Sequence, residues 1–182
     1  MATAEPWQTA EIPGPKKALV ITKPEVVATM IKKAKRPILV VGHKAVETEM
    51  DKKKLIDLMV ELAKKAEIPV VATAHIVGEF HKRKHKPAGF MSAVDIGNRL
   101  VDPEWTGIEG KGQHDLALFV GLPYYMEWTI LSGLKHYAPN LKTISLDNVY
   151  HPHASWSFPN SSTKDWVKNL RAIIEKFEEG GK

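Results

Sequence analysis

The sequence predicts a three-layer α/β domain in which a mainly parallel sheet is flanked by helices. Short apolar, β-branched runs without polar alternation recur along the chain, as in strands covered on both faces. Stretches with helical spacing of apolar residues separate these runs, which is typical of a Rossmann-like fold. A chain of 182 residues can bury one core. We therefore expect one domain over residues 16–182, preceded by an extended, Pro-rich arm over residues 1–15.

The first half of the chain predicts two helix–strand units. Pro24 suits the first turn of a helix, and Arg36 ends that helix because the residue before a proline leaves helical geometry. Thr48 with Asp51 resembles a capping box at the start of a second helix. The expected elements are a helix over 24–34, a strand over 38–42, a helix from 48 to 66, and a strand over 68–73.

The second half repeats this alternation after a loop-rich segment that holds the basic tract 81–86. Gly121 ends the third apolar run as Gly42 ends the first. Ser162 with Asp165 predicts the cap of a last helix. The expected elements are a helix over 92–100, a strand over 115–121, a helix over 127–136, a strand over 142–146, and a helix from 162 to 177.

The carboxyl ends of the predicted strands are the expected site of any ligand. Right-handed crossovers bring the loops after Gly42, Thr73, Gly121 and Leu146 to one edge of the sheet, where α/β proteins bind ligands. Gly42 and His43 stand between a strand and a helix, as a phosphate-binding turn would. The G-x-G-x-x-G fingerprint is missing, as is the acidic residue expected about 20 residues further on. A standard NAD site is therefore not expected, while binding of another nucleotide near Gly42 and Gly121 is left open.

The eight histidines do not form a recognisable metal motif. His81 and His85 would share a helix face, but the lysines and the arginine between them oppose cation binding, and there is no H-E-x-x-H. His151 and His153 form a second pair, which we interpret as structural. The tract 81–86 carries no interleaved aromatic residues, so it predicts an exposed loop rather than a nucleic-acid surface. We expect neither a metal site nor nucleic-acid binding.

The chain contains no cysteine, which excludes disulfides and removes the thiolates that iron–sulfur clusters normally use. There is no G-x-S-x-G motif either. Asp147 and the pair His114-Asp115 could serve as acid or base, but such groups occur in most chains of this size. We therefore predict no catalytic residue. No apolar run approaches the roughly 20 residues of a membrane span, and no signal-peptide pattern is present, so we expect a cytoplasmic protein.

Aromatic side chains and charge bear on possible partners. The net charge of +5 is spread over lysines, which predicts a solvated surface or a docking surface for an acidic protein. Loop-borne Trp and Tyr residues are enriched at protein interfaces and favour a subunit over a solitary enzyme. These residues are Trp105, Tyr124, Tyr125, Trp128, Tyr150, Trp156 and Phe158, with Trp7 in the arm.

Four segments resemble the central domain of thiamine-diphosphate enzymes such as acetolactate synthase. Residues 24–42 run from a helix into Ala-Lys-Arg-Pro and an apolar strand ending in glycine, and residues 61–73 end in Ile-Pro-Val-Val-Ala-Thr. Residues 114–121 and 141–147 resemble the two later strands of that domain. The resemblance implies a DHS-like NAD/FAD-binding fold over most of the chain.

Some members of that family bind FAD in this domain. The resemblance therefore implies candidate cofactor-binding positions at Gly42, His43, Thr73, Gly121 and Asp147. It implies no catalytic residue, because the thiamine chemistry uses other domains that this chain lacks.

With the Pro-rich arm, Tyr124-Tyr125 and His151-Pro-His153, nearly the whole chain resembles the epsilon subunit of the archaeal acetyl-CoA decarbonylase/synthase complex. That resemblance implies a large nickel–iron–sulfur alpha subunit as partner, in an alpha-two/epsilon-two heterotetramer. It implies a non-catalytic role that stabilises the carbon monoxide dehydrogenase component or helps to pass electrons to FAD, with no cofactor intrinsic to this chain. A stand-alone flavin- or nucleotide-binding electron-transfer protein remains the alternative.

Overall fold

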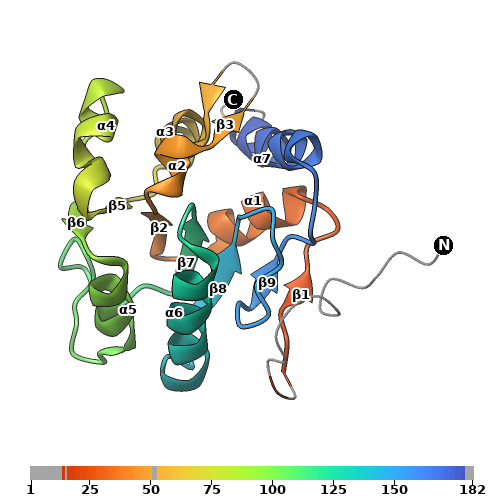
Figure 1. Cartoon of the computed structure of the whole chain (residues 1–182). Helices are drawn as coiled ribbons and strands as arrows, with labels where there is room; N and C mark the ends of the chain where they lie inside the picture. Colours follow the sequence, from red (N-terminus) through yellow and green to blue (C-terminus); the bar gives the residue numbers. More distant parts are fainter. Residues whose placement is uncertain (1–13, 15, 51–52, 179–182) are drawn as a thin grey trace.

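The computed structural model describes residues 14, 16–50 and 53–178. Within them, one sheet has the strand order β1-β9-β8-β7-β2-β5-β6, and every neighbouring pair in it is parallel (Figure 1). Its strands are β1 (Leu19–Val20), β2 (Pro37–Val41), β5 (Val70–Thr73), β6 (Gly89–Met91), β7 (Leu116–Val120), β8 (Lys142–Ser145) and β9 (Trp156–Ser157). This is the α/β, Rossmann-like architecture that the sequence predicts.

The central strands β2 and β7 are the apolar runs that the sequence identifies. Every residue of β7 is buried, as are four of the five residues of β2. The two strands pair in register from Pro37 with Leu116 to Val41 with Val120. Such strands need apolar side chains in both directions, since helices cover both faces of the sheet.

Side chains alternate between two cores, one on each face of the sheet. Leu39 and Val41 of β2 pack with α1, α3 and α7. Ile38 and Val40 of the same strand pack with α5 and α6, which lie side by side in Figure 1. The covering helices are α1 (Glu25–Lys33), α3 (Leu55–Ala66), α5 (Ala93–Val101), α6 (Tyr124–Tyr137) and α7 (Thr163–Glu178).

The predicted start of the second long helix is wrong. A four-residue helix α2 (Lys44–Glu47) and a small hairpin of β3 (Glu49–Met50) and β4 (Lys53–Lys54) come first. Helix α3 begins only at Leu55, where the Asp57 side chain accepts the backbone N–H of Lys54 at 2.7 Å. Thr48 therefore caps no long helix, and Asp51 lies outside the described residues. The capping pattern at Thr48 did not set the helix start, because Asp57 can accept a backbone N–H in the same way for a helix that begins later.

Other differences concern short or polar segments. Helix α4 (Val77–Lys82) includes His81 and ends before His85, so these two histidines do not share a helix face. Helix α6 begins three residues before the predicted start, directly after Pro123. Strands β1, β6 and β9 were not expected, because runs of two or three residues show no periodicity. The last helix does begin as predicted, with the Ser162 hydroxyl accepting the backbone N–H of Asp165 at 3.2 Å.

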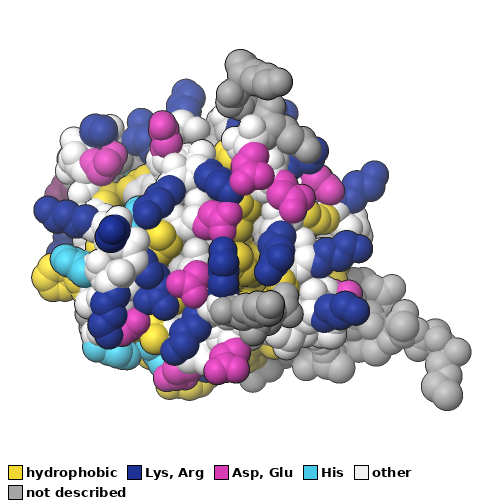
Figure 2. Space-filling view, turned by 90° about the horizontal axis from the view of Figure 1, so that it is seen from above, with side chains coloured by type: hydrophobic (Ala, Val, Ile, Leu, Met, Phe, Trp, Pro, Cys, Tyr) yellow, Lys and Arg dark blue, Asp and Glu magenta, His cyan; other side chains and the backbone are white. Residues whose placement is uncertain are grey.

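The surface carries charges of both signs. In Figure 2, Lys and Arg side chains are interspersed with Asp and Glu over the face shown. In the basic tract, the Arg83 guanidinium pairs with Asp57 at 2.5 Å and with Glu79 at 2.9 Å. No helix in the described part of the chain is long and apolar enough to span a membrane. The predicted arm lies almost entirely outside the described residues.

Candidate functional site

The order in which the chain adds strands to the sheet reverses between β2 and β7. After β2 the chain continues through α3 to β5 on one side, and after β7 it continues through α6 to β8 on the other. Because α3 and α6 cover opposite faces, their starts diverge at this edge. Such a switch point is where open α/β sheets place their ligand crevice. The predicted site residues Gly42 and Gly121 end these two strands.

Gly42 and Gly121 are glycines because the two turns touch. A Cβ built on Gly42 would lie 2.2 Å from the carbonyl oxygen of Gly121. That same oxygen accepts the backbone N–H of Lys44 at 2.9 Å, and Ala45 donates its N–H to the Gly42 carbonyl at 3.1 Å. Gly121 also has a φ of +72°, a left-handed value that favours glycine.

These contacts leave little room for a phosphate group at the turn. The backbone N–H groups of Gly42, Lys44 and Ala45 all form hydrogen bonds with backbone carbonyls, those of Val120, Gly121 and Gly42 respectively. The N–H of Gly121 forms a hydrogen bond with the Asp147 carboxylate. A pyrophosphate would need such groups free. The residues at these two turns therefore do not fit the dinucleotide cradle of FAD.

The remaining predicted positions are divided between two places. Thr73 ends β5, which lies on the opposite side of β2 from β7. The His43 ring lies near the His75 ring, with centroids 5.6 Å apart. Asp147 follows β8 and reaches Gly121, whose N–H it accepts at 2.9 Å. The structure thus brings together Gly42, Gly121 and Asp147 and leaves Thr73 apart.

A cleft of about 220 Å³ opens beside Asp147 at this edge. Its walls come from the loops after β2, β7 and β8 and from the start of α7. This volume is below the roughly 300 Å³ at which sites for drug-sized ligands begin. It suits a small ligand or an ion. The side chains that line it include Lys44, Tyr124, Asp147, His151 and Trp166.

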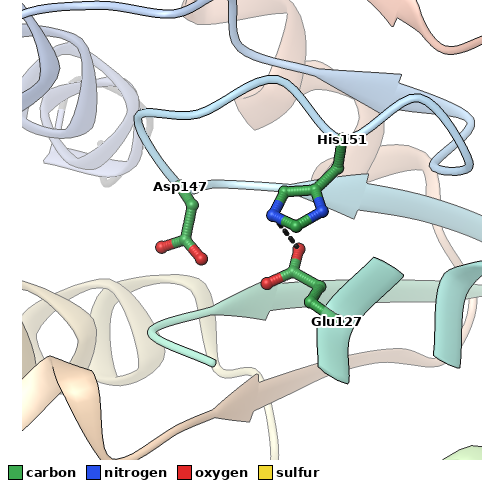
Figure 3. Close-up of side chains that lie close together, drawn as sticks. All are labelled: Glu127, Asp147 and His151. Atoms are coloured by element: carbon green, nitrogen blue, oxygen red, sulfur yellow. Dashed lines mark ion pairs between the residues drawn. The ribbon is translucent and has the colours of Figure 1, made fainter. Parts of the chain in front are cut away.

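Below this cleft, Glu127, Asp147 and His151 point toward one another (Figure 3). Glu127 comes from the first turn of α6, while Asp147 and His151 come from the loop after β8. Glu127 and His151 are 0% and 1% exposed, and one ligand atom from each of the three side chains lies within 4.8 Å of the others. The His151 Nε2 atom lies 3.7 Å from Glu127 Oε1.

Burial governs the ionisation of this cluster. Burial raises the pKa of Glu127 well above its usual value, and the charge of Asp147 raises it further. Burial also raises the pKa of Asp147 to about 6, although the Gly121 N–H, the Glu127 carboxyl and the Lys44 charge act to lower it. Both carboxyl groups therefore hold a proton more tightly than exposed carboxyl groups do.

His151 is uncharged at neutral pH. Burial lowers the pKa of His151 to about 4. Its ring stacks on Tyr124 with centroids 4.5 Å apart and planes tilted by 30°. The cluster therefore consists of two carboxyl groups and one neutral imidazole, a set that can hold either a proton or a metal ion.

Glu127 was missed as a site residue, although the sequence contains a signal for it. Residues 127, 130, 131 and 134 share one helical face, and the last three are the buried Ile130, Leu131 and Leu134. An acidic residue on an apolar stripe is rarely left without a function or a partner. For His151 the sequence contains no signal beyond its position in a predicted loop. The sequence analysis interpreted His151 as structural and did not predict that it lies beside Glu127 and Asp147.

Comparison with known proteins shows that the chain is similar to the epsilon subunits of acetyl-CoA decarbonylase/synthase complexes. Residues 1–174 match the family model described as CO dehydrogenase beta subunit/acetyl-CoA synthase epsilon subunit. The acetyl-CoA decarbonylase/synthase complex subunit epsilon of Methanothermobacter thermautotrophicus is 40% identical over 170 residues, which cover 92% of this chain and 93% of that protein. Subunit epsilon 1 of Archaeoglobus fulgidus is 40% identical over 165 residues, covering 90% and 85%. Subunit epsilon of Methanothrix soehngenii is 36% identical over 156 residues, covering 85% and 80%.

Proposed function

The chain belongs to the family of CO dehydrogenase beta subunits and acetyl-CoA synthase epsilon subunits, and from that premise we propose that it is a non-catalytic accessory subunit. Its place would be the carbon monoxide dehydrogenase component of an acetyl-CoA decarbonylase/synthase complex. The observation that carries this proposal is the similarity to epsilon subunits over 92% of the chain.

The partner that we propose is the large nickel–iron–sulfur alpha subunit, in an alpha-two/epsilon-two heterotetramer. The chain has no cysteine, so it supplies no thiolate to an iron–sulfur cluster. The clusters and the oxidation of carbon monoxide would then belong to alpha. The role of this chain would be to stabilise that component by binding it.

Exposed apolar side chains at the cleft support a docking role. Tyr125 is 71% exposed in the first turn of α6, and Val149 is 44% exposed in the loop after β8. Both stand at the carboxyl edge of the sheet, beside the cleft. A large aromatic residue left in water at such an edge is typical of an interface anchor. We propose that this edge faces alpha.

A role in passing electrons to FAD is the finer form of this proposal, and the geometry of the Gly42 and Gly121 turns does not favour it for this chain alone. The backbone N–H groups there are already donated. A flavin shared with alpha would have to use other residues. The stand-alone flavoprotein alternative needs the same missing cradle and is disfavoured for the same reason.

Anaerobic affinity purification of the tagged chain from its native cells tests the proposal. We expect the wild type to recover a large nickel- and iron-containing protein together with carbon monoxide oxidation. Two variants locate the interface: Tyr125→Ser and Tyr137→Ser. The two tyrosines are equally exposed, at 71%, and lie at opposite ends of α6. Tyr125→Ser should lower the recovery of alpha about tenfold, a loss typical of an exposed interface anchor, and Tyr137→Ser should not.

Two other outcomes of the purification would contradict the subunit role or the proposed interface. Recovery of the wild type alone, or with proteins that lack nickel and iron, would contradict the subunit proposal. Equal recovery of alpha by both variants would keep the subunit role and show that the proposed edge is not the interface.

A further inference from the structure

The cluster of Glu127, Asp147 and His151 contains an unusual concentration of buried polar atoms without partners. In the part of the chain that the structure describes, eight buried side-chain nitrogen and oxygen atoms have no hydrogen-bond partner. Three of them lie at the cluster: both oxygens of Glu127 and the Ser145 hydroxyl. His151 turns its Nε2 atom toward Glu127, at 3.7 Å. Native proteins satisfy nearly all such atoms, so a cluster of exceptions calls for a missing partner.

The position of Ser145 ties this set together. It is the last residue of β8 and is 0% exposed. Its hydroxyl is near enough to the Glu127 carboxyl to lower the pKa of that group, but no atoms of the two side chains lie within normal hydrogen-bond distance. Asp147, two residues later, already accepts the Gly121 N–H, which fixes its carboxylate at the edge of the cluster. The two oxygens of an ionised Glu127 can only accept, whereas the serine hydroxyl can also donate. A cation would satisfy the acceptors together.

We propose that Glu127, Asp147 and His151 form a binding site for one first-row divalent transition-metal ion, such as Zn²⁺. The carboxylate forms of Glu127 and Asp147 would bind the ion, and any proton that Glu127 carried would leave to solvent. This site is independent of the subunit role proposed above, because all three ligands come from this chain.

The ligand types decide the class of ion. Mg²⁺ and Ca²⁺ prefer sites made only of oxygen, whereas an imidazole with two carboxylates suits Zn²⁺, Co²⁺, Mn²⁺ or Fe²⁺. Bonds of about 2.0–2.2 Å in a tetrahedral set place ligand atoms about 3.4 Å apart, so the atoms that now lie up to 4.8 Å apart would close by up to about 1.4 Å. Most of this movement would come from the Glu127 side chain, because the Gly121 N–H holds the Asp147 carboxylate. The stacking of His151 on Tyr124 holds the imidazole in place.

The cleft provides the way in and a fourth ligand position. Asp147 and His151 line the cleft, while Glu127 lies beneath it. Lys44 lines the same cleft and acts on Asp147, so it is the one charge of the same sign that an entering ion would meet there among the described lining residues. Two carboxylates against this single ammonium group leave the site attractive to a dication.

A bound ion would also hold together the elements that carry the exposed Tyr125 and Val149. Tyr125 lies two residues before Glu127 in α6, and Val149 lies between Asp147 and His151. One ion would therefore cross-link the start of α6 to the loop after β8. We assign it a structural role at this edge of the sheet.

Titration of the metal-stripped full-length chain with Co²⁺, followed by visible absorption, tests the site, with Zn²⁺ competition to confirm it. We expect one Co²⁺ per chain, displaced by Zn²⁺. Glu127→Gln keeps the size of the side chain and removes the charge. It should weaken binding by at least about 100-fold, since losing only an outer-shell partner of a ligand already costs up to that much. His81→Ala is the matched control: this histidine is exposed and belongs to the basic tract, and its loss should leave binding unchanged.

The opposite results would overturn the proposal. No saturable Co²⁺ or Zn²⁺ binding by the wild type would mean that the carboxyl pair holds only a proton. Binding that survives Glu127→Gln but is lost with His81→Ala would place the ion on surface histidines. If Glu127→Gln fails to fold, ring-nitrogen NMR of the wild type decides: Zn²⁺ must shift the signals of His151 and not those of His81.

Discussion

Replacing Gly42 by alanine is expected to destabilise the protein at the point where β2 and β7 leave the sheet. The new methyl group would lie 2.2 Å from the Gly121 oxygen, 2.5 Å from its carbonyl carbon and 2.7 Å from the Leu122 side chain. The first two atoms are backbone, and that backbone is held by hydrogen bonds from Lys44 and to Asp147. The clash therefore cannot be relieved by turning a flexible side chain.

The magnitude follows from two opposing effects. Forcing a methyl group into packed backbone costs about 3 kcal/mol, the upper end of the usual range for overpacking. Gly42 has no left-handed φ, so alanine gains about 0.7 kcal/mol by restricting the unfolded chain. The net loss in free energy of unfolding is about 2 kcal/mol, which for a chain of this length lowers Tm by about 6 °C.

Urea unfolding followed by tryptophan fluorescence measures this loss, since the chain has five tryptophans. Gly133→Ala is the matched control. Gly133 lies inside α6 with nothing within 4 Å of a built Cβ, so alanine should stabilise by about 0.5–1 kcal/mol. If Gly42→Ala changes the free energy of unfolding by less than about 0.5 kcal/mol at an unchanged urea dependence, the close contact of the two turns is refuted.

Three further results are expected. Asp115→Asn should cost about 1–2 kcal/mol, because the Asp115 carboxylate accepts the backbone N–H groups of Lys35 and Arg36, each at 2.8 Å. Burial alone would raise the pKa of Asp115, but these N–H groups lower it overall. The difference from wild type should therefore be full above the ordinary Asp pKa of about 3.9 and vanish as the pH falls through the lower folded-state pKa; a difference that grows in acid would contradict this. Tyr150→Phe should cost about 1 kcal/mol in urea unfolding, because the buried hydroxyl donates to the Ala18 carbonyl at 2.6 Å, and an unchanged midpoint would show that this bond contributes nothing. FAD titration of the isolated chain should give no saturable fluorescence quenching at tens of micromolar, whereas saturation would restore the cofactor prediction at the glycine turns.

Much of the fold was predictable because the central elements are coded locally. The runs that form β2, β5 and β7 are apolar on both sides apart from the final Thr73 of β5, and strands between two helical layers need that pattern. Strand β8 (Lys142–Ser145) mixes polar and apolar residues and was recognised from its place in the alternation. The helices between them show one apolar stripe each. The family was also correctly identified from the sequence, as the full-length similarity to epsilon subunits confirms.

Short edge elements and one helix start could not be predicted in the same way. Strands β1 and β9 have two residues each, and what defines them is pairing with a neighbour that is distant in sequence. Two acidic residues, Asp51 and Asp57, could each have capped the helix that became α3. Because the hairpin of β3 and β4 precedes the helix, α3 begins at Leu55, and Asp57 accepts the N–H of Lys54. Local patterns describe what a segment prefers, whereas these features depend on what lies next to it.

For the site, the sequence by itself determined which residues follow the strands: Gly42 and Gly121 end apolar, β-branched runs, and Asp147 comes after the shorter and more polar strand β8. Only the tertiary structure decided which of these ends meet. The order of the strands places β2 beside β7 and leaves Thr73 one strand further away. It also turns the first turn of α6 toward the loop after β8, so that Glu127 meets His151. The physical reason is that periodicity fixes the face of an element that is buried, while the partner against that face is fixed by chain topology, which no local pattern contains.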